Sequence, residues 1–361
     1  MTDKTIIVLI ALLCFAIPLF LSAVLTPVSI RIAPKIGAMD VPNDSRRMHK
    51  TAVPRFGGFA IFIATTATLL TIRFFIFPVV PERFTFDEPI AKLTAIAIGG
   101  TLIYVLGFID DLLKIKPVVK LIFEIVCASV VFFLGVRIPA IDLLDLNFAG
   151  GSIESLITSY IVTVLWIVLI TNTINLIDGL DGLAAGVTAL AAFSIGYAAY
   201  LSGHWIVTLS MIACAGAAIG FLPYNFYPAK IFMGDSGALF LGFMLASISV
   251  IGPAKGATIV ATIVPVLVLG VPIFDILFAV LRRLVHRQSI FSADRGHLHH
   301  QLSNIGMGQR RAVFMLYGIS GIMGISAIIF SRRLYAEAVF LFIIAIVFIV
   351  LLIWEWNKDE K

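Results

Sequence analysis

Long apolar stretches separated by short polar ones recur along the whole chain, and this alternation predicts a bundle of membrane-spanning helices. A helix that crosses the hydrocarbon core of a bilayer needs about 20 consecutive apolar residues. Eleven segments approach or exceed that length: residues 6–29, 56–79, 91–109, 118–136, 156–172, 183–201, 205–222, 238–252, 258–280, 312–330 and 335–353. We therefore predict an all-α, polytopic integral membrane protein of about 11 transmembrane helices, with residues 1–361 forming a single domain.

The composition agrees with this class and excludes several others. Hydrophobic residues make up 60% of the chain and charged residues only 13%, whereas soluble domains carry about 25% charged residues. This excludes an ordinary cytosolic enzyme, a disordered chain and a nucleic-acid-binding protein. Cys14, Cys127 and Cys214 all fall inside apolar stretches and lack metal-ligand spacing, which indicates a packing role.

The basic residues are divided unevenly between the two sides of the predicted bundle. Of 26 lysine and arginine residues, 18 lie at the C-terminus or in loops after the first, third, fifth, seventh and ninth segments. The positive-inside rule makes that side cytoplasmic. An odd number of spans then places the N-terminus outside and the C-terminus in the cytoplasm. Residues 6–29 are interpreted as a span rather than a cleaved signal because the segment is long and lacks a small-residue cleavage site.

The residues suited to chemistry gather in loops on this cytoplasmic side, which are residues 30–55, 110–120, 172–182, 223–237 and 282–311. Asp110 and Asp111 end the third segment, and Asp235 precedes the eighth within Gly-Asp-Ser-Gly. Clustered carboxylates without thiols favour a hard cation, Mg²⁺ or alternatively Mn²⁺. Carboxylates beside lysine and arginine suit a polyanionic phosphate substrate bridged by that ion. For the Asp110–Asp111 pair and the Gly-Asp-Ser-Gly sequence, a solvated helix end and a helix cap are the structural alternatives.

A second polar group follows the fifth segment, where Asn172, Asn175, Asp178 and Asp181 recur at every third position. This spacing predicts that they share one helical face. Gly179 and Gly182 allow a tight turn or a close backbone approach. Four polar groups on one face at a membrane boundary cost free energy unless they line a cavity. The pattern therefore favours a substrate-binding face.

Two basic clusters complete the set of candidates. His49, Lys50 and Arg55 precede the second span; they either reflect topology alone or bind a lipid phosphate. Residues 294–300 read Asp-Arg-Gly-His-Leu-His-His. A zinc site is the alternative there, but no cysteine is nearby, so we favour histidine donors to phosphate or sugar oxygens.

Two carboxylates lie formally within apolar segments. Glu124 follows Lys120 by four residues, which predicts a local ion pair along one helix face. Asp275 has no evident partner nearby in the sequence, and we expect it to support the site from behind.

Taken in order, these motifs resemble those of the polyprenyl-phosphate N-acetylhexosamine-1-phosphate transferase superfamily, glycosyltransferase family 4. The aspartate pair, the asparagine-rich stretch 172–182, the sequence Phe-Met-Gly-Asp-Ser-Gly at 232–237 and the histidine motif 294–300 occur in the family's order. The histidine motif and eleven spans resemble the undecaprenyl-phosphate N-acetylglucosaminyl-1-phosphate transferase branch. Leu298 interrupts the three consecutive histidines that are usual in the muramoyl-pentapeptide branch.

The resemblance implies a role for each matching residue. Asp235 would be the main Mg²⁺ ligand, with Asp110 and Asp111 as catalytic or metal-assisting carboxylates and His297 as a catalytic group. The implied substrate-binding residues are Asn172, Asn175, Asp178, Gly179, Asp181, Phe232, Arg295, His299, His300, Lys120, His49, Lys50 and Arg55. Phe232 would pack on the uracil, and the first cytoplasmic loop would meet the lipid phosphate.

The implied reaction is transfer of N-acetylglucosamine 1-phosphate from UDP-N-acetylglucosamine to undecaprenyl phosphate in the bacterial plasma membrane, with release of UMP. It would begin a cell-surface polysaccharide or teichoic acid, and a homodimer is implied by the resemblance alone. Direct attack by the lipid phosphate is favoured, and a covalent aspartyl intermediate is the alternative. The competing functions are a related transferase acting on UDP-muramoyl-pentapeptide or another UDP-N-acetylhexosamine, and a membrane transporter, whose polar site would lie near the midplane.

Overall fold

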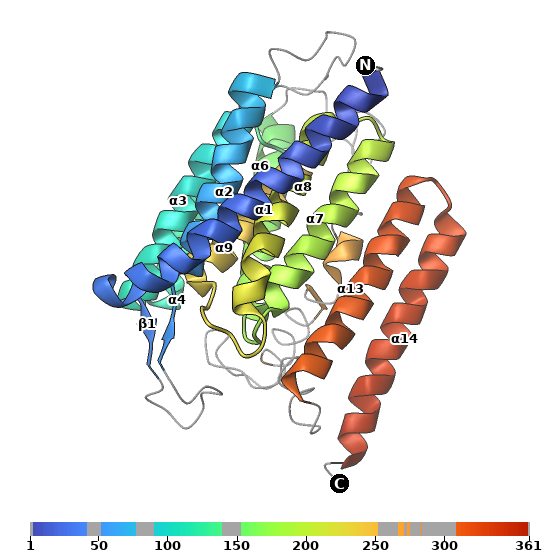
Figure 1. Cartoon of the computed structure of the whole chain (residues 1–361). Coiled ribbons are helices and arrows are strands. Elements are labelled where there is room, and N and C mark those ends of the chain that lie inside the picture. The colour runs from blue at the N-terminus through green and yellow to red at the C-terminus, as the bar shows by residue number, and fades with distance from the viewer. Residues whose placement is uncertain are drawn as a thin grey trace.

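The computed structural model describes residues 3–41, 52–76, 90–138, 153–251, 266–270, 273–274, 283 and 308–359. Within them the chain forms a bundle of helices with one small two-stranded sheet (Figure 1). The main helices are α1 (Asp3–Ile36), α2 (Gly57–Thr71), α3 (Ala91–Leu113), α4 (Pro117–Phe133), α6 (Ile153–Ile177), α7 (Leu183–Leu201), α8 (Trp205–Asn225), α9 (Gly234–Ser249), α13 (Gln309–Ser331) and α14 (Tyr335–Asp359). A π-helical turn, η1 (Ile72–Ile76), continues α2.

The structure confirms a polytopic helical membrane protein. Seven helices in the described part of the chain are long and apolar enough to cross a bilayer. These are Val8–Ile36, Gly57–Ile76, Ala91–Leu113, Ile153–Ile177, Leu183–Leu201, Trp205–Asn225 and Gln309–Ser331. The predicted segments 118–136, 238–252 and 335–353 correspond to helices α4, α9 and α14. Most of the predicted segment 258–280 lies outside the described residues.

The fold is all-helical as predicted, and the described residues add one short sheet between α1 and α2 that the sequence analysis did not predict. Strand β1 (Met39–Asp40) pairs antiparallel with β2 (Val53–Pro54), with Met39 opposite Pro54 and Asp40 opposite Val53. Strands of two residues are too short to produce the alternating pattern by which a sequence reveals a strand. The sheet matters for the site because Arg55 follows β2 directly.

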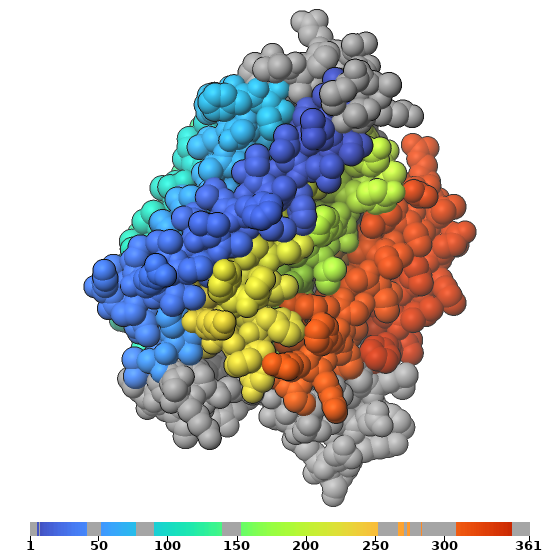
Figure 2. All heavy atoms as spheres, viewed as in Figure 1, coloured from blue at the N-terminus to red at the C-terminus, as the bar shows by residue number. Residues whose placement is uncertain are grey.

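The outer surface of the bundle is apolar, as the lipid environment requires. Large side chains such as Phe20, Phe133 and Leu165 are 67%, 72% and 63% exposed. A soluble protein would bury side chains of this kind. The space-filling view in Figure 2 shows α1 running obliquely across this face, between α2 and the α7–α8 pair. Cys14, Cys127 and Cys214 are all buried, in agreement with a packing role.

Helix packing brings the ends of several helices together at one end of the bundle. Helix α9 packs against α3 and α6, α4 packs against α3 and α6, and α2 packs against α3, α8 and α9. Helix α1 begins at the upper end in Figure 1, whereas the β1–β2 sheet lies at the lower end, where α14 also ends. The carboxylate, amide and basic residues of interest lie at this lower end.

Candidate active site

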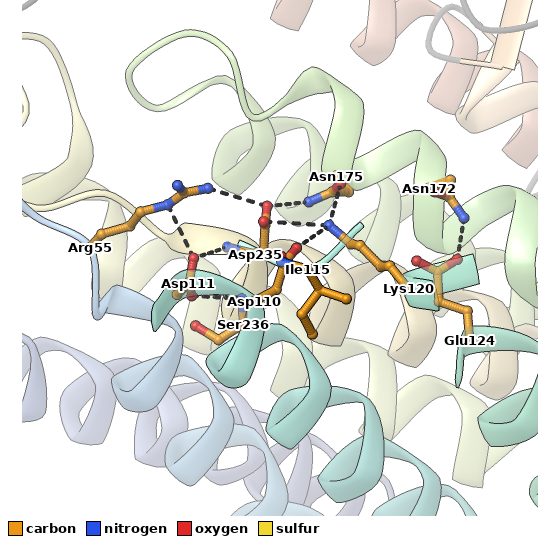
Figure 3. Close-up of polar contacts among 10 residues, drawn as sticks. All are labelled: Arg55, Asp110, Asp111, Ile115, Lys120, Glu124, Asn172, Asn175, Asp235 and Ser236. Carbon is orange, nitrogen blue, oxygen red and sulfur yellow. Dashed lines mark hydrogen bonds and ion pairs between the residues drawn. The ribbon is translucent and has the colours of Figure 1, made fainter. Parts of the chain in front are cut away.

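Asp235, in the first turn of α9, is the centre of the polar cluster (Figure 3). Its Oδ1 accepts a hydrogen bond from Asn175 Nδ2 at 2.9 Å and lies 3.4 Å from Arg55 Nη2. Its Oδ2 lies 3.4 Å from Lys120 Nζ. Two cations thus approach one carboxylate from opposite sides, and 22% of its side chain stays exposed.

Lys120 joins three polar groups from three different helices. Besides Asp235, its ammonium group lies 2.9 Å from Asp110 Oδ2 and donates to Asn175 Oδ1 at 3.3 Å. The other oxygen of Asp110 accepts the backbone N–H of Ile115 at 2.7 Å, across the turn between α3 and α4. An ammonium group has three hydrogens to donate, so Lys120 can satisfy all three neighbours at once.

Arg55 is positioned by the β1–β2 sheet and by the segment before α9. Its backbone N–H donates to Ala38 O at 2.8 Å. On either side of it, Phe232 N–H donates to Pro54 O at 2.8 Å and Gly57 N–H donates to Phe232 O at 3.0 Å. Burial alone would lower the pKa of Arg55, but the carboxylates of Asp235 and Asp111 outweigh it and raise the pKa. Arg55 is therefore a fixed positive charge at the site.

The structure places Asp111 differently from its neighbour Asp110. Its side chain has no exposed area. Oδ1 accepts the backbone N–H of Asp235 at 2.8 Å and lies 3.1 Å from Arg55 Nε, and Oδ2 accepts the N–H of Ser236 at 3.0 Å. The predicted boundary after residue 109 was too early, because α3 continues to Leu113 and both aspartates lie in its last turn.

The predicted ion pair between Lys120 and Glu124 is wrong. Lys120 turns to Asp110, Asp235 and Asn175 instead. Glu124 is 2% exposed and accepts a short hydrogen bond from Asn172 Nδ2. Local spacing allows an i, i+4 pair, but the denser cluster of carboxylates at the end of α3 attracts the lysine more strongly. The Glu124–Asn172 pair links α4 to α6, one helical turn deeper than the site.

The asparagine-rich stretch forms a single helical face only in part. Asn172 and Asn175 lie on α6, but the helix ends at Ile177, so Asp178 and Asp181 lie in the following turn. Gly182, the residue directly before α7, has φ +81°, a left-handed conformation that favours glycine. Asp181 Oδ2 accepts the backbone N–H of Ala229 at 2.9 Å. Its carboxylate therefore joins this turn to the loop before α9.

Sequence analysis missed two residues that fix the same turn. Asn225 Oδ1 accepts the N–H of Gly182 at 3.1 Å, while its Nδ2 donates to Ile231 O at 3.0 Å. The Tyr317 hydroxyl on α13 donates to Gly182 O at 2.5 Å. The sequence did contain a signal for both residues, since an amide and a phenol stand within otherwise apolar runs. Such polar groups need a hydrogen-bond partner inside a membrane protein.

Asp178 has no hydrogen bond or ion pair to its carboxylate among the residues that the structure describes. Burial raises its pKa well above 3.8, partly opposed by Arg55, and Asp235 and Asp111 raise it further. Above about pH 4, Asp178 is therefore protonated to a greater extent in the folded protein than in the unfolded chain. Its contribution to the free energy of folding becomes less favourable as pH rises.

We therefore expect the Asp178→Asn variant to be more thermally stable than the parent, by a margin that is larger at about pH 8 than at about pH 5. Melting temperatures of both purified proteins at the two pH values check this. A variant that is less stable than the parent, or a margin independent of pH, would contradict it.

Several predicted site residues lie outside the described part of the chain. These are His49, Lys50, Arg295, His297, His299 and His300, together with Asp275. The predicted residues that the structure does bring together are Arg55, Asp110, Asp111, Lys120, Asn175 and Asp235, with Asp178 close enough to Arg55 for each to shift the other's pKa. Phe232 is partly buried, and Gly179 is exposed in the α6–α7 turn.

The oxygen atoms of the cluster are of the kind that a divalent cation binds. In the described residues, no three histidine, cysteine or carboxylate side chains are already grouped as metal ligands. Among the described residues, the three carboxylates of Asp110, Asp111 and Asp235 are paired with two cations, Arg55 and Lys120, which leaves a formal charge of −1 when all three are ionised. Asp235 keeps exposed area and only long contacts to both cations. This charge and these oxygen donors fit Mg²⁺.

Comparison with known proteins agrees with this arrangement. The sequence pattern of glycosyl transferase family 4 matches residues 93–253, a range that contains every element of the cluster except Arg55. The chain is 38% identical, over 92% of its length and 88% of the relative's, to the "probable undecaprenyl-phosphate N-acetylglucosaminyl 1-phosphate transferase" of Bacillus subtilis. It is 35% identical, over 84% of its length and 78% of the relative's, to the "decaprenyl-phosphate N-acetylglucosaminephosphotransferase" of Mycobacterium tuberculosis.

A third relative represents another branch of the same group. The "phospho-N-acetylmuramoyl-pentapeptide-transferase" of Clostridium botulinum is 32% identical over 64% of this chain and 70% of its own length. The helical bundle and its charged cluster are thus those of an integral membrane enzyme that handles phosphate groups. The chain belongs to glycosyl transferase family 4 and is a phospho-N-acetylhexosamine transferase.

Proposed function

We propose that this protein transfers N-acetylglucosamine 1-phosphate from UDP-N-acetylglucosamine to undecaprenyl phosphate. The products are UMP and undecaprenyl-diphospho-N-acetylglucosamine, the lipid-linked start of a cell-surface polysaccharide or teichoic acid. The observation that supports the chemistry is Asp235 held between Arg55 and Lys120. Similarity supports the donor, because the N-acetylglucosamine-phosphate transferases align over 84–92% of the chain and the muramoyl-pentapeptide transferase over 64%.

The reaction replaces one phosphorus–oxygen bond with another. An oxygen of the lipid phosphate attacks the phosphorus attached to the sugar, and the bond from that phosphorus to the oxygen of the departing UMP breaks. The second pKa of a phosphate is about 6, so the acceptor is largely a dianion at neutral pH and needs no strong general base. The protein's main task is to position two anions that repel each other and to stabilise the charge that moves to UMP.

The described residues suit that task. Arg55 and Lys120 are fixed cations on either side of the place where the phosphates would meet. Asp235 would hold Mg²⁺, or Mn²⁺, with Asp110 close by, and the ion when bound would neutralise charge on the diphosphate. Asn175 orients the Asp235 carboxylate through its Nδ2. Arg295, His297, His299 and His300 keep their proposed roles at the sugar and phosphates, and His49 and Lys50 theirs at the lipid phosphate.

Direct attack by the lipid phosphate is favoured over a covalent aspartyl intermediate. Both oxygens of Asp110 are already engaged, one with Ile115 N–H and the other with Lys120. Both oxygens of Asp111 accept backbone N–H groups from α9. A carboxylate held in this way is a poor nucleophile, since attack would require it to give up charge-assisted hydrogen bonds.

The topology that goes with this proposal has eleven spans, the N-terminus outside and the C-terminus in the cytoplasm of a bacterial cell. It puts the cluster on the side rich in basic residues, where nucleotide sugars are available. A transporter is disfavoured because the cluster lies at helix ends rather than near the midplane. A homodimer is a further prediction, which the molar mass of the purified protein–detergent complex would test.

The first experiment is an assay in membranes with undecaprenyl phosphate, radiolabelled UDP-N-acetylglucosamine and Mg²⁺, with and without EDTA. We expect label in the lipid phase and UMP release, both abolished by EDTA. UMP release without lipid label would indicate hydrolysis or a different acceptor. Turnover with UDP-muramoyl-pentapeptide alone would assign the protein to the other branch and overturn the proposed donor.

A further inference from the structure

Asp111 differs from Asp235 in having no exposed side-chain area at which a ligand could bind. Its side chain is fully buried, and its two oxygens face three donors, which are the backbone N–H groups of Asp235 and Ser236 and Nε of Arg55. Asp235 by contrast is 22% exposed, and its contacts to Arg55 and Lys120 are 3.4 Å long. Of the two, only Asp235 can accept a metal ion without first losing its hydrogen bonds.

The beginning of α9 needs an external partner. The first N–H groups of a helix have no acceptor within the helix. The residue before α9 is Met233, whose side chain makes no capping hydrogen bond. Asp111, 124 positions earlier on α3, supplies the acceptors instead. A negative charge at this end also interacts favourably with the helix dipole.

The surrounding packing is shaped to admit this carboxylate. Gly234 has φ +74°, and a Cβ at this position would lie 2.6 Å from Asp111 Oδ2. On α2, a Cβ at Gly58 would lie 2.3 Å from the backbone nitrogen of Gly237 in α9. Glycine at both positions lets α2, α3 and α9 approach closely enough for a short aspartate to reach the amides.

We infer that Asp111 is a positioning residue that caps α9 from α3, and thereby fixes Asp235 between Arg55 and Lys120. It is neither a metal ligand nor a proton acceptor. Asp235 lies directly on the capped turn, because its own backbone N–H is one of the two donors. The neighbouring Asp110 has another task, since its oxygens hold Ile115 N–H and Lys120. The kinetic part of this inference rests on the proposed function, but the capping part does not.

Amide hydrogen exchange tests the capping directly, with peptides that cover residues 233–240 of the full-length protein in detergent. In Asp111→Ala we expect the amides of Asp235 and Ser236 to exchange about 10- to 100-fold faster than in the parent, as loss of hydrogen bonds to a charged acceptor implies. Asp111→Asn keeps one accepting oxygen, so its exchange rates should lie between those of the parent and those of Asp111→Ala. Asp110→Asn is the matched control and should leave this peptide unchanged. Unchanged exchange in both Asp111 variants would overturn the inference.

Enzyme kinetics distinguish a positioning role of Asp111 from a direct role in the chemical step. We expect Asp111→Asn to keep measurable turnover, within about 100-fold of the parent, with an unaltered shape of the pH–rate profile. If the folded Asp111→Asn protein has only background activity, or if its pH–rate profile loses a limb, then Asp111 takes part in the chemical step. Either result would overturn the inference.

Failure of a variant to fold and failure of the proposed function can each be distinguished from failure of this inference. If Asp111→Ala does not fold, Asp111→Asn and Gly234→Ala provide the same exchange comparison, and Gly234→Ala should also accelerate exchange at these amides. If the parent itself does not turn over UDP-N-acetylglucosamine, the proposed function fails, while the exchange experiment still decides the capping.

Discussion

Replacing Asp235 by asparagine is expected to reduce turnover to background, a loss of at least about 10³-fold. The amide has the same shape as the carboxylate but lacks its charge, so it binds a divalent cation weakly. Arg55 and Lys120 each keep a second carboxylate, Asp111 and Asp110 respectively. The fold should therefore survive, and the loss should appear in kcat rather than in the melting temperature.

The measurement is the lipid-transfer rate at saturating donor over a range of Mg²⁺ concentrations. Glu154→Gln is the matched control, because Glu154 is an exposed carboxylate in the first turn of α6, at the opposite end of that helix from Asn175. It should keep the parent's rate. Full activity of Asp235→Asn would remove Asp235 from the metal site and with it the centre of the proposed mechanism.

Replacing Lys120 by methionine is expected to lower turnover by about 10²- to 10³-fold and to destabilise the protein by about 3 kcal/mol. Methionine keeps most of the apolar stem but leaves Asp110 and Asp235 without their shared cation. The Lys120 side chain is only 14% exposed and that of Asp110 8%, so water cannot fully replace the lost partner. Repulsion between the two carboxylates would then also disturb the donor diphosphate.

Lys120→Arg should fail to restore activity. A guanidinium holds its donors in one plane and on separate nitrogens, so it cannot reproduce the single ammonium nitrogen that faces Asp110, Asp235 and Asn175. Lys116→Met is the control, because Lys116 is an exposed lysine just before α4. Initial rates and thermal unfolding of the three variants check the prediction. An active Lys120→Met protein would mean that the ammonium group is not needed at the phosphates.

The sequence predicted the class of protein and the gathering of the polar residues at one end of the bundle, and both have a simple cause. Apolar segments of spanning length have few alternatives to membrane helices, because every backbone polar group in lipid must be paired. Polar residues in such a chain are confined to helix ends or to functional sites. Asp110, Asn175 and Asp235 could thus be expected to meet on one side, although they are far apart in sequence.

The sequence could not assign different roles to neighbouring residues of the same type. Asp110 and Asp111 are adjacent, but successive residues of a helix point about 100° apart. One therefore reaches Lys120 on α4, and the other reaches the first amides of α9. The same limit explains the incorrect Lys120–Glu124 pair and the missed contact from Tyr317 to Gly182. In each case the partner belongs to another helix, so the local sequence does not reveal it.

What the sequence by itself determined is the membrane class, most of the helices and the set of chemical groups at one end, since these follow from local composition and periodicity. What only the tertiary structure decided is which carboxylate faces a cation, which faces a backbone amide and which has no hydrogen bond or ion pair within the described part of the chain. The physical reason is that a hydrogen bond or ion pair depends on distance and direction to within about half an ångström and a few tens of degrees. Only the packing of α3, α4, α6 and α9 sets these for Asp110, Asp111 and Asp235.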